Sequence, residues 1–148
     1  MAIKLDMANA FDRVNNFFLF EIMHKLGFSK KFCRWIKACV VRPWIAPLVN
    51  GRLAGFFQAS QGLCQGYPLS PFLYLIVVES MSKKLQALQN NSEIRGLKIA
   101  RGFKNANHSQ FVDNTILLGG ASVIIAKIFK EVISTFLKAS DGEINATK

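Results

Sequence analysis

The sequence is poor in acidic residues. It contains 9 Asp and Glu against 19 Lys and Arg over 148 residues, which gives a formal net charge of +10. A basic excess of this size favours a polyanionic partner, most simply nucleic acid. The alternative is a basic globular protein with no special partner, because net charge bears on association and not on fold.

Cysteines and long apolar runs are also scarce. Cys33, Cys39 and Cys64 lie far apart, form no Cys-x-x-Cys pair, and have no histidine at metal-ligand spacing. They predict reduced thiols, as in a nuclear or cytosolic protein. The start of the chain shows no signal-peptide pattern. The longest apolar stretches, such as residues 72–78, fall short of the roughly 20 residues that span a bilayer.

The remaining composition, 51% hydrophobic and 19% charged, fits a single globular domain. Local patterns predict a mostly antiparallel sheet backed by helices on one face, an α+β fold. The first half should contain a strand over 2–5 that ends in Asp6, a helix from Asn15 or Asn16 to Lys25 or Leu26, a helix over 30–41, and a hairpin of 48–49 with 56–57 around Asn50-Gly51. A helix capped by Ser70, with Pro71, should follow and run to about Leu88. The rest should contain a strand over 97–99, a hairpin of 110–112 with 115–118 around Asp113-Asn114, a helix capped by Ser122 and ended by Asp141-Gly142, and a strand from 143.

Two carboxylates stand at the ends of predicted strands. Asp6 follows the first strand, and Asp113 lies at the turn of the second hairpin. If these elements are neighbours in the sheet, the two side chains can bind Mg²⁺, which prefers oxygen ligands. Two such ions about 3.5–4 Å apart support an in-line phosphoryl displacement. The structural alternative is that each Asp only makes local turn or cap hydrogen bonds.

The polar loop over residues 61–71 carries a second candidate site. Gly62 and Gly66 allow the backbone to approach a ligand closely. The helix that begins after the loop offers free N–H groups to an anion. The alternative is an ordinary capped loop.

Four segments, in the order of the chain, resemble motifs A to D of reverse transcriptases from LINE-type (non-LTR) retrotransposons. Retrotransposons of this type are abundant in plant genomes. Residues 4–14 are similar to motif A, in which a metal-binding Asp is followed five residues later by an aromatic. Residues 61–71 contain the Gln-Gly-x-Pro-Leu-Ser-Pro signature of motif B, and residues 111–114 resemble motif C. Residues 142–145 together with Lys148 resemble motif D. The resemblance covers essentially the whole chain.

The resemblance implies a polymerase palm with a ferredoxin-like antiparallel sheet. It also implies RNA-directed DNA polymerisation with two Mg²⁺ ions, an RNA template, a DNA primer and deoxynucleotides. Carried over residue by residue, it assigns metal binding to Asp6 and Asp113, catalytic roles to these two and to Asn114 and Lys148, the steric gate against ribonucleotides to Phe11, and nucleotide contacts to Gln65 and Gly66.

Three positions depart from the family pattern. Asn114 stands where motif C usually has Asp, Cys64 where motif B usually has Arg, and Tyr67 where it usually has Asp. These changes predict low or lost activity. The resemblance also predicts that residues 1–148 comprise a palm with motifs A to D, without fingers and thumb.

The alternative to an enzyme is a non-catalytic basic module that binds nucleic acid or a partner protein. Lys30, Arg34 and Lys37 share one face of a predicted helix and are spaced to follow a phosphate backbone. A solvated helix face explains the same pattern. The two functions differ in their dependence on Mg²⁺ and on the two carboxylates.

Overall fold

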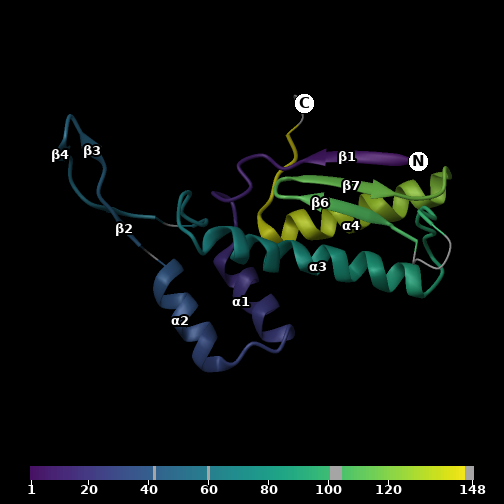
Figure 1. The fold of residues 1–148 in the computed structure, drawn as a ribbon, viewed down its shortest axis with the longest axis horizontal. Coiled ribbons are helices and arrows are strands. Elements are labelled where there is room, and N and C mark those ends of the chain that lie inside the picture. The colour runs from purple at the N-terminus through teal and green to yellow at the C-terminus, as the bar shows by residue number, and fades with distance from the viewer. Residues whose placement is uncertain (42, 60, 101–104, 146–148) are drawn as a thin grey trace.

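The computed structural model describes residues 1–41, 43–59, 61–100 and 105–145. Its centre is a three-stranded antiparallel sheet in the order β1-β7-β6. Two long helices, α3 and α4, back one face of this sheet (Figure 1). The α+β class and the antiparallel sheet with helices on one face are therefore as predicted. The bounds are β1 Ala2–Asp6, β6 His108–Phe111, β7 Asn114–Leu118, α3 Ser70–Asn90 and α4 Val123–Ser140.

The core lies between the sheet and these two helices. In β7, Thr115 and Leu117 are fully buried while the residue between them is exposed, as expected for a strand with one face on a core. Phe129 of α4 is also fully buried, and its ring lies so close to Gly119 that a Cβ there would be 3.0 Å away. The burial of these side chains holds α4 against the end of the central strand.

Helices α1 (Asn16–Lys25) and α2 (Lys30–Val40) form a pair on the side of α3 away from the sheet (Figure 1). The Asn15 side chain caps α1 by accepting from the Phe18 N–H at 3.1 Å. The Ser29 hydroxyl caps α2 in the same way. Both starts were predicted from these polar residues, which satisfy N–H groups that lack a partner within the helix. Helix α2 ends at Val40, one residue before the predicted end.

An extended arm leaves the body between α2 and α3 (Figure 1). The predicted pairing of residues 48–49 with 56–57 is wrong. Asn50 and Gly51 have φ values of 50° and 75°, which suit a two-residue turn, and such a turn pairs the residues directly beside it. The arm therefore contains two small antiparallel pairs, β3 (Leu48–Val49) with β4 (Arg52–Leu53) and β2 (Trp44–Ile45) with β5 (Phe57–Gln58).

The turn of the second hairpin differs from the prediction by one residue. It consists of Val112 and Asp113, with Val112 at φ 51°, and Asn114 is the first residue of β7. Asn114 pairs with Phe111 on one side and with Asp6 on the other. The local preference of Asn for turns is overridden because two neighbouring strands offer it ladder hydrogen bonds.

Three further details differ from the prediction. Ser70 is the first residue of α3 and not its cap, because its hydroxyl donates instead to the Cys64 carbonyl at 2.7 Å. The expected strand over 97–99 consists of one isolated bridge from Leu97 to Ala106. The expected last strand is likewise an isolated bridge, between Ile144 and Met7. Among the described residues, no helix is long and apolar enough to cross a membrane.

Candidate active site

Asp6 and Asp113 lie on adjacent strands at one edge of the sheet. Asp6 is the last residue of β1 and lies opposite Asn114 in the β1–β7 register. One residue further on, the Met7 N–H donates to the Asp113 carbonyl at 3.0 Å. Both Asp residues are half-buried. The β-sheet thus brings together two carboxylate-bearing residues that are 107 positions apart in the sequence.

The chemistry of this edge suits a hard divalent cation. Asp6 and Asp113 supply carboxylate oxygens, and Asn114 adds an amide oxygen. The described residues contain no cluster of three His, Cys, Asp or Glu side chains that could enclose a metal. An Mg²⁺ ion is usually held by one or two carboxylates and completes its octahedron with water and substrate phosphate, so Asp6 and Asp113 are the residues that would hold one here.

The Asn114 side chain also forms a hydrogen bond with the adjacent carboxylate of Asp113. Its side-chain Nδ2 donates to Oδ1 of Asp113 at 2.9 Å. An aspartate at this position would add a negative charge and would have no N–H to donate. The Asn114 amide therefore occupies one of the carboxylate oxygens that a cation would use.

The loop after β1 places Phe11 on helix α3. The Phe11 ring lies against the ring of Tyr74, with centroids 5.1 Å apart and an interplanar angle of 35°. Tyr74 is buried, and burial together with the nearby negative charge of Asp113 raises its pKa to about 12. Its phenol therefore stays neutral at physiological pH. The Tyr74 ring supports the Phe11 ring, and its pKa responds to the charge of the Asp113 carboxylate.

The glycine loop over residues 61–69 is attached to the same segment by its backbone. The Leu63 N–H donates to the Phe11 carbonyl at 2.8 Å, and the Gly62 N–H donates to the Val14 carbonyl at 3.1 Å. Gly62 has φ 85°, and a Cβ there would lie 2.4 Å from the Asp12 carbonyl oxygen. This contact requires glycine, but the close approach is to the backbone of Asp12, whereas the sequence analysis expected an approach to a ligand.

Gln65 is joined to the same segment by its side chain. Its Nε2 donates to both carboxylate oxygens of Asp12, at 3.0 and 3.2 Å. Both side chains are exposed, and the adjacent Gly66 has φ 82° with open space where a Cβ would be. The structure therefore brings Phe11, Gln65 and Gly66 into two loops, the one after β1 and the glycine loop, that are hydrogen-bonded to each other. The part played by Asp12 was missed in the sequence, although its place directly after Phe11 marked it.

The segment after α4 runs beside Asp6. The Ala8 N–H donates to the Glu143 carbonyl and the Asn145 N–H donates to the Asp6 carbonyl, each at 2.8 Å. An ion pair of 2.8 Å joins Arg13 to Glu143. The motif D segment thus lies against the motif A segment. Lys148, to which the resemblance assigns a catalytic role, lies outside the described residues.

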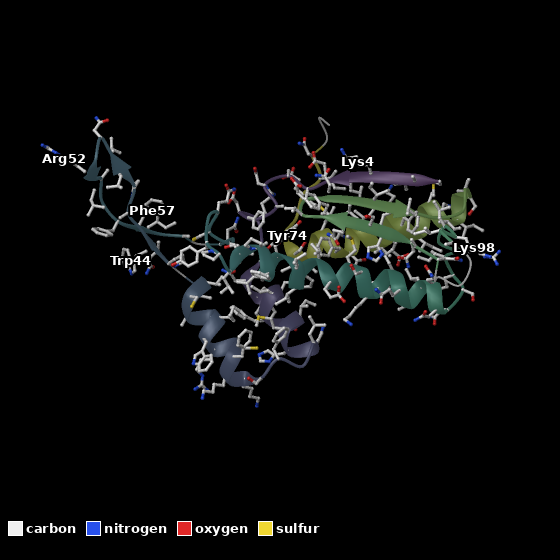
Figure 2. All side chains as sticks on the ribbon, viewed as in Figure 1. Lys4, Trp44, Arg52, Phe57, Tyr74 and Lys98 are labelled. Atoms are coloured by element: carbon white, nitrogen blue, oxygen red, sulfur yellow. The ribbon has the colours of Figure 1, made fainter. Side chains whose placement is uncertain are left out.

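An open groove separates the arm from the glycine loop. Asp12, Gln65 and Tyr67 line it on one side, and Trp44 lines it on the other. Trp44 is 68% exposed, and Figure 2 shows it with Phe57 on the arm, well away from Tyr74 in the body. Cys64 and Tyr67, two of the departures from the motif B pattern, both lie in the wall of this groove.

The whole chain, residues 1–148, matches the family model described as reverse transcriptase (RNA-dependent DNA polymerase). The chain belongs to the reverse transcriptase family. Its relatives include the Pol polyprotein of the type-1 retrotransposable element R2 of Popillia japonica, with 28% identity over 78% of this chain, and that of the type-2 R2 element of Drosophila melanogaster, with 24% identity over 98%. These relatives confirm the prediction of a non-LTR retrotransposon reverse transcriptase.

A mitochondrial protein of Arabidopsis thaliana, described as uncharacterized, is 32% identical over 46% of this chain and 56% of its own length. The chain spans only 18% and 13% of the two R2 polyproteins. Two telomerase structures share its fold. That of Candida albicans, in complex with a fragment of telomeric RNA, gives a TM-score of 0.69 at 13% identity, over 99% of this chain and 27% of that one. That of Candida tropicalis gives 0.65 at 19% identity, over 96% and 28%.

Proposed function

We propose that residues 1–148 form the palm of an RNA-directed DNA polymerase, with Asp6 and Asp113 as its catalytic carboxylates. The observation that carries this proposal is the pairing of Asp6 with Asn114, together with the hydrogen bond from Met7 to Asp113. These backbone contacts join the motif A and motif C segments at one sheet edge, which supports a shared role for Asp6 and Asp113. Fingers and thumb are assigned to segments outside these residues.

In the proposed reaction, the primer 3′-hydroxyl attacks the α-phosphorus of a deoxynucleotide. A new P–O bond forms, the bond to the pyrophosphate leaving group breaks, and the hydroxyl proton passes to solvent water. Asp6 and Asp113 would hold two Mg²⁺ ions, whose charge stabilises the attacking and leaving oxygens when they are bound. The share of the protein is positioning and charge stabilisation.

The other site residues would position the nucleotide. Phe11, held on Tyr74, would occupy the space of a ribose 2′-hydroxyl and so favour deoxynucleotides. Gln65, oriented by Asp12, and Gly66 would contact the incoming nucleotide and the template base. Lys148 would donate a proton to the leaving pyrophosphate.

The proposed partners are an RNA template and a DNA primer. Support comes from the family match, from the R2 relatives and from the telomerase solved with RNA. The net charge of +10 suits the same partners.

We further propose that present activity is low. Asn114 leaves the edge with one negative charge fewer than an aspartate would, and its amide hydrogen bond competes for Oδ1 of Asp113. Cys64 and Tyr67 replace a charged pair in the wall of the groove beside Gln65. Each change weakens either cation binding or the polar character of the nucleotide site.

Primer extension on poly(rA) with an oligo(dT) primer and Mg²⁺ or Mn²⁺ tests the proposal. We expect trace extension by the native chain and more by the Cys64→Arg, Tyr67→Asp, Asn114→Asp triple variant. Adding Asp6→Ala to that variant should abolish extension, whereas adding Glu131→Ala, an equal charge change at an exposed position of α4, should not. Extension that survives Asp6→Ala would refute the assignment.

A further inference from the structure

Most of the net positive charge of the chain comes from one segment that has no acidic residues. Residues 22–78 contain seven Lys and Arg and no Asp or Glu. The rest of the chain is nearly balanced, with twelve basic and nine acidic residues. Most of the net charge therefore belongs to α2, the arm and their connections.

Helix α2 carries four of these seven cations. Lys30, Lys31, Arg34 and Lys37 are all exposed. Within the part of the chain that the structure describes, none of the four forms an ion pair with a carboxylate. These four cations therefore have no carboxylate in ion-pair contact among the described residues, and their charge is available to a polyanion.

Three of these cations border a groove between α1 and α2. Lys30, Arg34 and Lys37 lie at positions i, i+4 and i+7, which follow one helix face over about 10 Å. The α1 side of the groove adds two aromatic rings, one carboxylate and one histidine, from Phe17, Phe20, Glu21 and His24. Phe17 is 74% exposed. A second exposed ring, Trp35, lies on α2 with the Lys31 Nζ 5.1 Å from its centroid.

We call this surface the α2 face; it consists of Lys30, Arg34 and Lys37 of α2 together with Phe17, which α1 contributes from across the groove. The α2 face is remote from the catalytic edge. Helices α1 and α2 lie on one side of α3, and the sheet that carries Asp6 and Asp113 lies on the other (Figure 1). A ligand bound between α1 and α2 would therefore not occupy the nucleotide site.

We propose that the α2 face binds single-stranded nucleic acid at a second site, outside the catalytic edge. A row of cations follows a phosphate backbone, and exposed aromatic rings stack on unpaired bases, which a duplex does not offer. The strand is the template RNA or the DNA product, and in this respect alone the inference rests on the proposed function.

The test is fluorescence anisotropy with labelled oligo(rA) and oligo(dT), with the native chain compared to Lys30→Gln, Arg34→Gln, Lys37→Gln. Each single-strand phosphate contact contributes about 0.7 to the slope of log affinity against log salt. Removing three contacts should lower that slope by about 2 and weaken binding at 0.1 M salt on the order of 100-fold. Phe17→Ala should weaken it by about fivefold or more, because a stacked base is lost.

The matched control is Lys127→Gln, Lys130→Gln, Lys138→Gln, which removes three exposed cations from α4. Equal weakening by both triple variants would overturn the proposal, since net charge alone would then explain binding. Competition by polyglutamate or duplex DNA as strong as by the single strand would overturn it too, in favour of an acidic protein or a general polyanion surface. Preference for oligo(rA) or oligo(dT) identifies the strand.

The outcome is separable from that of the proposed function. Asp113→Ala should leave binding at the α2 face unchanged, while it removes any primer extension. Unchanged binding by the Lys30→Gln, Arg34→Gln, Lys37→Gln variant, with primer extension intact, would locate the strand on the catalytic side only and would refute this inference alone. Circular dichroism of each variant checks that α2 is still folded.

Discussion

Gly62 joins the loops of motifs A and B, and its replacement by alanine should loosen both. An alanine at φ 85° costs about 1–2 kcal/mol from the left-handed backbone alone. Its Cβ would also lie 2.4 Å from the Asp12 carbonyl oxygen, so the loop must move. That movement breaks the hydrogen bonds from Gly62 to Val14 and from Leu63 to Phe11, each contributing about 1 kcal/mol. The expected total loss is about 3–4 kcal/mol.

Gly27→Ala is the matched control, because Gly27 has φ 87° and no atom within 4 Å of the added Cβ. It should lose only the backbone share, about 1–2 kcal/mol. Urea unfolding followed by circular dichroism measures both variants, and the loss for Gly62→Ala corresponds to roughly 10 °C in Tm. Equal losses for the two variants would show that the contact with Asp12 does not constrain the loop.

Two further predictions concern Asp12 and His108. Asp12→Ala should release the Gln65 side chain and speed hydrogen exchange of the backbone amides of residues 64–67. Asp12→Asn keeps one acceptor for the Gln65 Nε2 and should have a smaller effect. Unchanged exchange in Asp12→Ala would contradict a positioning role for Asp12. Burial lowers the pKa of His108, against an opposing effect of Glu79, so the unfolded chain takes up the proton first as the pH falls. The stability contributed by neutral His108 is therefore present above about pH 6.5 and lost below it. Urea midpoints at pH 7.5 and 5.5 should differ more for the native chain than for His108→Gln.

Local sequence signals account for most of the helices and strands. Capping by Asn15, Ser29 and Ser122 defines three helix starts, because a side-chain oxygen satisfies an N–H group within three residues. The errors arose where distant segments decide. Asn114 belongs to strand β7 and not to the turn, because β1 pairs with it. Ser70 does not cap α3, because its hydroxyl donates to the Cys64 carbonyl.

The candidate site was predictable only in part, for the same reason. Motif order identified Asp6 and Asp113, and the sheet places them at one edge. No local pattern indicated that Phe11 rests on Tyr74 or that Asp12 holds Gln65, because these partners are 63 and 53 residues apart. The absence of acidic residues from positions 22–78 is visible in the sequence. The sequence does not show that the α2 cations and Phe17 border one groove, because this depends on the packing of α1 against α2.

The proposed function requires that Asp6 and Asp113 together bind divalent cations, and that Asn114 weakens this binding. Mn²⁺ titration followed by electron paramagnetic resonance, which reports free Mn²⁺, tests this without any need for activity. We expect weak binding by the native chain, loss of binding in Asp6→Asn and in Asp113→Asn, and no change in the exposed control Glu131→Gln. Asn114→Asp should bind Mn²⁺ at least tenfold more tightly, equivalent to about 1.4 kcal/mol. Mn²⁺ affinity that is the same in the native chain, Asp113→Asn and Asn114→Asp would contradict this requirement.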